Sequence, residues 1–325
     1  MITQDLQVKW EALDSKPKTN QYDLLLLSES SYAELFLARA PSTERSLVLR
    51  VQFLENISFK DLEGENISLI RDTVNNFIVI KLLNIHFKEL FDYLIVSIAN
   101  AITDLVVAEE YSKVFLRAFS RWLQFFVILP DSKHTRNVIQ GIFGELIVLE
   151  VLLTQNMTPD VSHILRAWRG PYDTAQDFLL ENKNIEVKTI QEGNFSVKIA
   201  NEGQLDQADG KDLELAVVHL NSKTASGLTL SELINKVASI CEQRLADIGI
   251  VYEALRQKNL VPANFSDYDD FIFHPAGVSF FDCGLENFPK LVGSNLPNSI
   301  NRVRYSINTN ELDEFEIRKI KYDDC

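Results

Sequence analysis

Short runs of aliphatic and β-branched residues mark the first part of the chain, and charged or turn-forming segments separate them. This pattern is typical of strands in an antiparallel sheet. Apolar residues then recur at helical spacing over 87–107 and 109–127. We therefore expect an N-terminal β-rich domain with a trailing helix over residues 1–107. Its strands are predicted at 34–39, 46–51, 67–70 and 77–82.

The middle of the chain changes to a succession of helix, strands and helix. A helix is predicted over 135–153 and a longer one over 231–258. Between them lie a hairpin over 177–188 and two strands, at 195–199 and 213–220. This order is typical of an α/β domain, which we place at residues 108–260.

The chain becomes aromatic and strand-like again after Pro262. We interpret residues 261–325 as a C-terminal β extension. Its predicted strands are 271–273, 277–281, 303–307 and 316–320.

Charge and composition narrow the class of protein. The formal net charge of −14 over 325 residues argues against a protein that coats nucleic acid, which would be basic. It makes a partner protein or a bound cation more plausible. Charged residues interrupt the longest apolar stretches, so no membrane span is expected. Three scattered cysteines and a polar start indicate a cytoplasmic chain without structural zinc.

Strand alternation makes the hairpin at 177–188 a candidate site, because it places polar side chains together. Ile185 and Val187 point to one face, so Glu186 and Lys188 point together to the other. Eight residues separate Asp177 from Glu186, and the polar turn between them lets the two acids lie on adjacent strands. Two carboxylates can hold a hard divalent cation, and a lysine can orient a water or stabilise the transition state.

The triplet Glu186-Val187-Lys188 is weak evidence by itself. Acid-x-Lys occurs at four other places, including Glu181-Asn182-Lys183. Only the triplet at 186–188 combines an alternating strand with a second acid one hairpin upstream. The alternative is a surface hairpin with a cross-strand salt bridge, which would contribute little.

Glu145 adds a third acid. On a helix its neighbours are Ile142, Val148 and Leu149, and an acid on such an apolar face is costly to bury without a partner. A metal ion or Lys188 would be such a partner. An ion pair within the helix or an exposed helix edge explains Glu145 as well.

The residues Glu145, Asp177-Phe178 and Ile185-Glu186-Val187-Lys188 together resemble the core of the PD-(D/E)XK nuclease superfamily, of restriction-endonuclease type. The sequence of these motifs is similar to that of a PD-(D/E)XK family associated with bacterial restriction and phage-defence gene clusters. The resemblance covers roughly 130–258. Ala175-Gln176 departs from it, because the superfamily name has proline before the aspartate.

This resemblance implies a restriction-endonuclease-like α/β core, with a mixed central sheet flanked by helices, and Mg²⁺-dependent cleavage for which Mn²⁺ can substitute. By the same resemblance Asp177, Glu186 and Glu145 would be metal ligands, with Glu145 an accessory acid. Lys188 would be the catalytic lysine.

Several other residues are candidates for nucleic-acid contact. Arg166 and Arg169 could bind phosphates, and Trp168 between them could stack on a base, although packing of Trp168 in the core is the favoured interpretation. Arg136 near a helix start could bind phosphate or be simply solvated. Gln204 falls where some members of the superfamily place a glutamine near the site.

We therefore expect a metal-dependent DNA endonuclease of a restriction or phage-defence system. The alternatives are a weak or inactive DNA- or protein-binding subunit of a defence complex, and a metal-free scaffold. Cutting both strands needs two sites, so a homodimer or a larger complex is expected. The sequence leaves open DNA or RNA, strandedness and recognition sequence.

Overall fold

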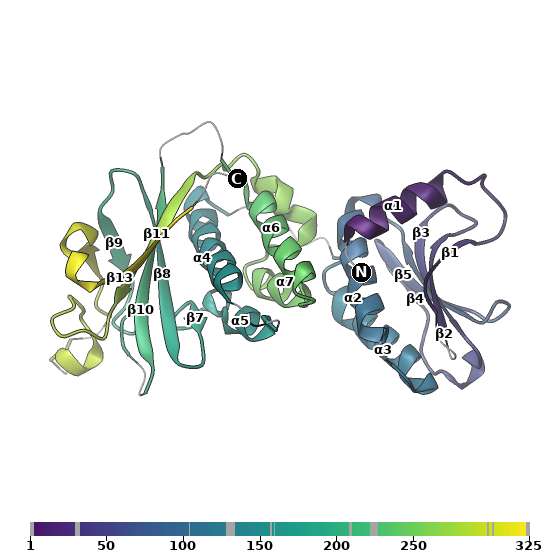
Figure 1. Ribbon diagram of the computed structural model, residues 1–325, viewed down its shortest axis with the longest axis horizontal. Coiled ribbons are helices and arrows are strands. Elements are labelled where there is room, and N and C mark those ends of the chain that lie inside the picture. The colour runs from purple at the N-terminus through teal and green to yellow at the C-terminus, as the bar shows by residue number, and fades with distance from the viewer. Residues whose placement is uncertain are drawn as a thin grey trace. The chain divides into compact units, whose positions relative to one another are not determined.

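The structure is a computed structural model of the 325-residue chain. It describes residues 3–29, 33–103, 105–127, 134–156, 158, 160–207, 210–221, 227–297, 299–300 and 302–322. The chain forms two compact units (Figure 1). Unit 1 comprises residues 1–129 with 261–263, and unit 2 comprises 130–260 with 264–325.

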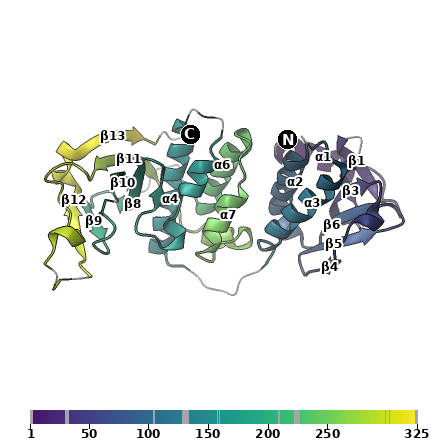
Figure 2. The same cartoon turned by 90° about the horizontal axis from the view of Figure 1, so that it is seen from below.

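Unit 1 is built on a six-stranded antiparallel sheet in the order β1-β2-β3-β6-β5-β4. Helices α1, α2 and α3 lie on one face of this sheet, as Figures 1 and 2 both show. The elements are α1 (Thr3–Asp14), β1 (Asp23–Glu29), β2 (Ala33–Arg39), β3 (Arg45–Val51), β4 (Leu62–Glu63), β5 (Ile67–Asp72), β6 (Phe77–Leu82), α2 (Lys88–Ile102) and α3 (Ala108–Leu123).

Alternation along the strands of unit 1 divides its apolar residues between the two faces of the sheet. Phe36, Val48, Phe77 and Val79 form a small cluster with Tyr22 and neighbouring apolar residues. Buried aliphatic residues at the alternate positions belong to the main core, among them Leu35, Leu37, Leu47, Leu49, Ile78 and Ile80.

Unit 2 is built on a five-stranded mixed sheet in the order β13-β11-β10-β8-β7. The central strands β8 and β10 are parallel and the remaining pairs are antiparallel. A separate ribbon pairs β9 with β12. The strands are β7 (Phe178–Leu179), β8 (Lys183–Gln191), β9 (Ser196–Ile199), β10 (Asp212–Leu220), β11 (Pro275–Asp282), β12 (Tyr305–Asn308) and β13 (Glu316–Lys321).

The helices of unit 2 lie on one side of this sheet and the β9–β12 ribbon on the other (Figure 1). Helix α4 runs directly against β8 and packs on α6. Buried residues of β9, β10 and β12 form a second core on the ribbon side, among them Val197, Leu215 and Ile307. The helices are α4 (Arg136–Gln155), α5 (Ser162–Ala167), α6 (Leu230–Gln243) and α7 (Gly249–Arg256).

Helix α4 is long and apolar enough to cross a membrane, with a mean hydropathy of 1.6 over its most apolar window. More than half of that window (56%) is buried inside the protein. A core helix that is covered on most sides has the same composition, and its packing on β8 and α6 accounts for it.

The element boundaries differ from the expectations at several places, and the helix predicted over 109–127 ends at Leu123. The predicted helix 231–258 is two helices, because α6 ends at Gln243 and Leu245 takes a left-handed φ of 51°. The helix predicted over 87–107 ends at Ile102. Residues 271–273 form no strand, and only Phe273 makes an isolated bridge, to Leu228. Helix α1 and strand β1 were not predicted.

The two units also divide the chain differently from the predicted boundaries at 107/108 and 260/261. Helix α3 lies in unit 1. Strands β11 and β13 complete the sheet of unit 2 instead of forming an extension apart from it. The mixed α/β character of the fold agrees with the sequence analysis.

Candidate functional site

The predicted hairpin places Asp177 beside Glu186. Phe178 pairs with Ile185 in the β7–β8 register, and the Asp177 amide donates to the Ile185 carbonyl at 3.0 Å. Asp177 Oδ2 accepts a hydrogen bond from the Val187 amide at 2.7 Å. This bond fixes the carboxylate against the strand that carries Glu186 and leaves Oδ1 pointing elsewhere.

Glu186 and Lys188 lie on the same face of β8, as alternation predicts. Lys188 Nζ donates to Glu186 Oε1 at 2.6 Å. The Glu186 side chain is 2% exposed and that of Lys188 is 18% exposed. Gln204 Oε1 lies 3.4 Å from the same Nζ and accepts from the Ala200 amide at 2.7 Å. Gln204 thus holds the ammonium group from a loop after β9.

Glu145 reaches this group because α4 touches β8 through a glycine. A Cβ at Gly144 would lie 1.8 Å from Thr189 Oγ1, so no larger residue fits between helix and strand. The next residue, Glu145, therefore starts close to the sheet. Its Oε2 accepts from Trp168 Nε1 at 2.8 Å, and Trp168 is 1% exposed.

Gly170 shows how close the two acids from different elements lie. A Cβ at Gly170 would be 2.2 Å from Glu145 Oε2 and 2.7 Å from Asp177 Oδ1. The amides of Arg169 and Gly170 both donate to the Asp177 carbonyl, at 2.7 and 3.0 Å. The bare backbone of Gly170 therefore lets the carboxylates of Glu145 and Asp177 approach the same point.

Burial raises the pKa of all three carboxyl groups, and repulsion between the acids adds to it for Glu145 and Glu186. Burial raises the pKa of Glu186 to about 8, and the charge of Asp177 adds to it while Lys188 opposes it. Burial, Asp177 and Glu186 hold the pKa of Glu145 well above its usual range. Burial also raises the pKa of Asp177, although the Val187 amide and Lys188 favour its charged form. Perturbed acids that share one place are a feature of functional sites.

Positive charge is scarce around these acids. Among the three acids, Lys188 forms its ion pair with Glu186. Lys258, whose Nζ donates to Asp173, lowers the pKa of Glu145 and Asp177 by Coulombic attraction from farther away. Three buried or partly buried carboxylates thus share one adjacent ammonium group, and a further cation would relieve their repulsion.

The donor chemistry fits a hard divalent cation. All three side chains offer oxygen, and each has one oxygen that accepts a hydrogen bond from the protein and a second that accepts none from the described residues. Across the residues that the structure describes, no three His, Cys, Asp or Glu side chains form a ready-made metal cage. Mg²⁺ does not require one, because it binds through one or two carboxylates and retains several waters.

The four candidates for nucleic-acid contact lie in different surroundings. Gln204 lies at Lys188, and Arg169 adjoins Asp177 through its backbone while its guanidinium stacks 4.4 Å above Tyr172. Arg166 is exposed on α5. Arg136 is occupied elsewhere, because it donates to the Ile272 carbonyl at 2.9 Å and stacks on aromatic rings.

Trp168 is buried and donates to Glu145, so the interpretation of Trp168 as a base-stacking surface is wrong. Gln176 also has a role that the sequence did not reveal. Its Nε2 donates to the carbonyls of Gly203, Gln204 and Asp206 at 2.9–3.4 Å. The residue that replaces the expected proline therefore anchors the loop of Gln204.

Gly170 and Lys258 were missed as well. A glycine directly after Trp168-Arg169 was the only signal for a close backbone approach. Nothing in the sequence connected Lys258 to a hairpin eighty residues upstream. Both become recognisable only through tertiary contacts.

Comparison with known proteins gives a family match. A family model described as "Putative PD-(D/E)XK family member" (DUF4420) matches residues 6–310, which include most of both units. No curated protein and no solved structure matches the chain. The mixed α/β architecture is consistent with a PD-(D/E)XK-like fold, which suggests a nuclease-like hydrolase. Because the match spans nearly the whole chain, this protein belongs to that PD-(D/E)XK family.

Proposed function

We propose that the protein is a metal-dependent endonuclease that hydrolyses DNA phosphodiester bonds. The observation that carries the proposal is the convergence of Asp177, Glu186 and Glu145 around one lysine at the edge of the sheet. Because the protein belongs to a nuclease-like family, we take this cluster as the candidate catalytic site. A structural ion pair would instead balance acids and bases.

The three carboxylates are the proposed ligands of the cation. PD-(D/E)XK nucleases generally use divalent metals, and we expect Mg²⁺, with Mn²⁺ as a substitute, held by Asp177, Glu186 and Glu145. When bound, the cation would supply Lewis acidity toward the phosphate and make a water more acidic. The Val187 amide and Trp168 Nε1 hold two of these carboxylates in place.

Lys188 is the proposed catalytic lysine. Its ammonium group lies on the same strand face as Glu186, 2.6 Å from Oε1. From there it would orient the attacking water and offset the negative charge that grows on the phosphate oxygens. Gln204 would act as a positioning residue, because its Oε1 faces the same Nζ at 3.4 Å.

Arg166 and Arg169 are the proposed phosphate contacts. Arg169 directly precedes Gly170 and is hydrogen-bonded through its amide to the Asp177 carbonyl. Arg166 is exposed on the preceding short helix. Arginine at such a position binds phosphate without reading the base sequence.

Cleavage assays on two matched pairs of variants test the proposal. Glu186→Gln and Lys188→Met should each lower the cleavage rate of DNA with Mg²⁺ or Mn²⁺ by roughly 10²–10⁴-fold, as expected for loss of a ligand or a charge-stabilising group. The matched controls are Glu181→Gln and Lys198→Met, which alter an exposed acid in the turn before β8 and an exposed lysine on β9. The controls should retain cleavage.

Metal-dependent cleavage that survives both substitutions would show that the site lies elsewhere. RNA and single-stranded, double-stranded and branched DNA belong in the same assay, because phosphodiester chemistry is common to all of them. We further propose a role in a bacterial restriction or phage-defence system, in the cytoplasm, and a homodimer or larger complex for cutting both strands.

A binding subunit with weak or no cleavage is the second candidate. The net charge of −14 favours it, because an acidic chain needs help from a partner or a cation to bind DNA tightly. It predicts no nicking of any substrate by the isolated chain and a stable complex with a partner protein. Robust turnover by the isolated chain would exclude it.

A further inference from the structure

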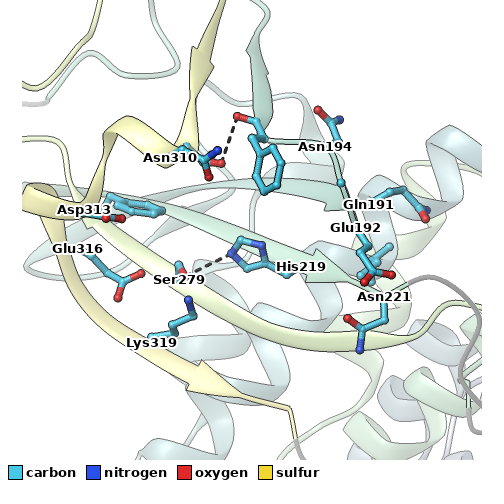
Figure 3. A pocket seen from close by; sticks show the side chains of 15 residues that line it. Gln191, Glu192, Asn194, His219, Asn221, Ser279, Asn310, Asp313, Glu316 and Lys319 are labelled. Atoms are coloured by element: carbon cyan, nitrogen blue, oxygen red, sulfur yellow. Dashed lines mark hydrogen bonds between the residues drawn. The ribbon is translucent and has the colours of Figure 1, made fainter.

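A pocket of about 360 Å³ with a mixed polar and apolar lining opens at the far end of β8, where β8, β10 and β11 meet the segment before β13 (Figure 3). His219 lies among its lining residues with its ring toward Ser279, and their Nε2 and Oγ atoms are 3.3 Å apart. Glu316 and Lys319 lie beside this pair, and Glu192 and Asn221 lie on the other side. The pocket belongs entirely to unit 2.

The pocket opens on the face of the sheet that carries Glu186 and Lys188. His219 follows Leu215 and Val217 on alternate positions of β10, and Leu215 pairs with Glu186 in register. Gln191, at its edge, is three residues beyond Lys188 on the same strand, which is about 10 Å at the usual rise of a strand. On this face Ile190, which belongs to the buried ribbon-side core, separates Lys188 from the pocket, so a strand of nucleic acid held at Lys188 would have to pass around the β9–β12 ribbon to reach it.

The lining combines an aromatic surface with amide groups. Phe195 is 51% exposed although it is apolar, and it borders the pocket. Asn194 and Asn310 add exposed side-chain amides, each able to donate and to accept. The Phe195 carbonyl accepts from the Thr309 amide at 2.7 Å, which joins the two segments that carry these side chains. An exposed aromatic face beside amides suits a planar heterocycle with polar edges.

The charges of the lining argue against a phosphate as the occupant. Glu192, Asp313 and Glu316 face a single Lys319. Burial and Lys319 lower the pKa of His219 below its ordinary value and Glu316 opposes them, so the surroundings favour the neutral ring. A neutral imidazole can donate at one nitrogen and accept at the other. The pocket therefore disfavours an anionic ligand and can accept an uncharged one that donates hydrogen bonds.

We propose that this pocket binds a nucleobase, with Phe195 as the stacking surface and His219 and Asn310 as hydrogen-bonding groups. The inference rests on the proposed function for one source of the base, a nucleotide of the strand held at Lys188. The other source is a free nucleoside. The volume lies at the small end of the usual range for ligand pockets, which suits one base rather than a dinucleotide.

Calorimetric titration of the full chain with adenosine, guanosine, cytidine and thymidine tests the pocket directly, with ribose and inorganic phosphate as comparison ligands. A second titration uses a short single-stranded oligonucleotide. Phe195→Ala should weaken binding of the nucleoside, the oligonucleotide or both by about fivefold or more, as loss of a stacking partner does. The matched control is Phe53→Ala, since Phe53 is an exposed phenylalanine of unit 1.

The pattern of results also identifies the source of the base. Binding of nucleosides that Phe195→Ala weakens indicates a free ligand, and an effect on the oligonucleotide alone indicates a base of the bound strand. Equal binding of ribose or phosphate, or no effect of Phe195→Ala on either titration, would overturn the proposal. Lys188→Ala must retain nucleoside binding, so the pocket and the cleavage site can fail independently.

Discussion

Each unit of the protein contains a tryptophan that donates to a carboxylate at the same distance, yet the two pairs lie in different surroundings. In unit 1, Trp10 Nε1 donates to Asp92 Oδ1 at 2.8 Å. In unit 2, Trp168 Nε1 donates to Glu145 Oε2, also at 2.8 Å. The tryptophans are each 1% exposed. The hydrogen bond itself therefore does not distinguish the two places.

The difference lies in the charges around each acid. Burial raises the pKa of Asp92 to about 6, and Arg45 and Lys88 oppose Glu89 at longer range. Around Glu145, burial is followed by the repulsion of Asp177 and then of Glu186. A single buried acid with neighbouring bases is a structural feature, whereas crowded acids are costly to the fold and are retained where they have a task.

Another buried carboxylate, that of Glu214 on β10, has two cations as neighbours, whereas Glu145 has other acids. Glu214 accepts from Lys183 Nζ at 2.6 Å and from Arg318 Nη2 at 2.7 Å, and its side chain is 8% exposed. Glu214→Gln removes the charge between two cations, each about a quarter to a third exposed. We expect the free energy of unfolding to fall by about 3 kcal/mol, measured by urea denaturation.

Glu181→Gln is the control for this substitution, because Glu181 is exposed in the turn before β8. A surface change of that kind alters stability by about 0.5 kcal/mol or less. If Glu214→Gln changed the free energy of unfolding as little as Glu181→Gln, the charges around a buried acid would not indicate its role in this protein.

Addition of Mn²⁺ separates the two tryptophan-bound acids more directly. Binding to the native state should stabilise unit 2 by about 2.7 kcal/mol when the free ion is at a hundredfold excess over Kd. Asp177→Asn should abolish this gain, and Asp92→Asn should leave it intact. The melting temperature with and without Mn²⁺ is the measurement, and equal stabilisation of wild type and Asp177→Asn would contradict a metal site at the cluster.

The site was largely predictable because its central part is local. Alternation on β8 put Glu186 and Lys188 on one face, and the polar turn placed Asp177 next to them, as the β7–β8 register bears out. Glu145 was found because an acid stood on an apolar helix face. What brings it there, the contact of Gly144 with Thr189, joins residues 45 positions apart and has no local signature.

The fold was less predictable where no helix-breaking residue in the sequence marks the end of an element. No glycine or proline marks the end of α6, and the left-handed conformation of Leu245, 75% exposed, ends it. Helix α1 has little contrast between its faces, yet Leu6, Trp10 and Leu13 are fully or nearly fully buried. Packing of α1 on α2, β1 and β2 decides this helix, and local propensity does not.

Asp92→Asn should change how stability depends on pH. The pKa of Asp92 is raised in the folded state from its ordinary 3.8 to about 6, so the folded state holds an extra proton between these values. Stability from this group is present below about pH 4 and is lost as pH rises to 6 and above. Asparagine keeps the acceptor for Trp10 and cannot ionise, so the variant should gain about 2 kcal/mol over wild type between pH 4 and pH 7.

Hydrogen exchange of α2 peptides at a series of pH values measures this gain within unit 1. Unit 2 serves as the internal control, because its exchange should respond to pH alike in both proteins. A constant difference between Asp92→Asn and wild type across the series would show that Asp92 is already charged at pH 4.

Trp168→Phe and Trp10→Phe give the finest comparison, since each removes the N–H donor and the same part of the ring from a buried tryptophan. Without the indole donor, Glu145 loses the contact that orients it toward Asp177. We expect Trp168→Phe to weaken Mn²⁺ binding about tenfold, or about 1.4 kcal/mol, as substitutions behind a metal ligand do. Trp10→Phe should leave the Mn²⁺ affinity unchanged and lower only the stability of unit 1, by about 1 kcal/mol. Calorimetric titration with Mn²⁺ gives both affinities, and equal affinities for the two variants would mean that Glu145 does not contribute to the metal site.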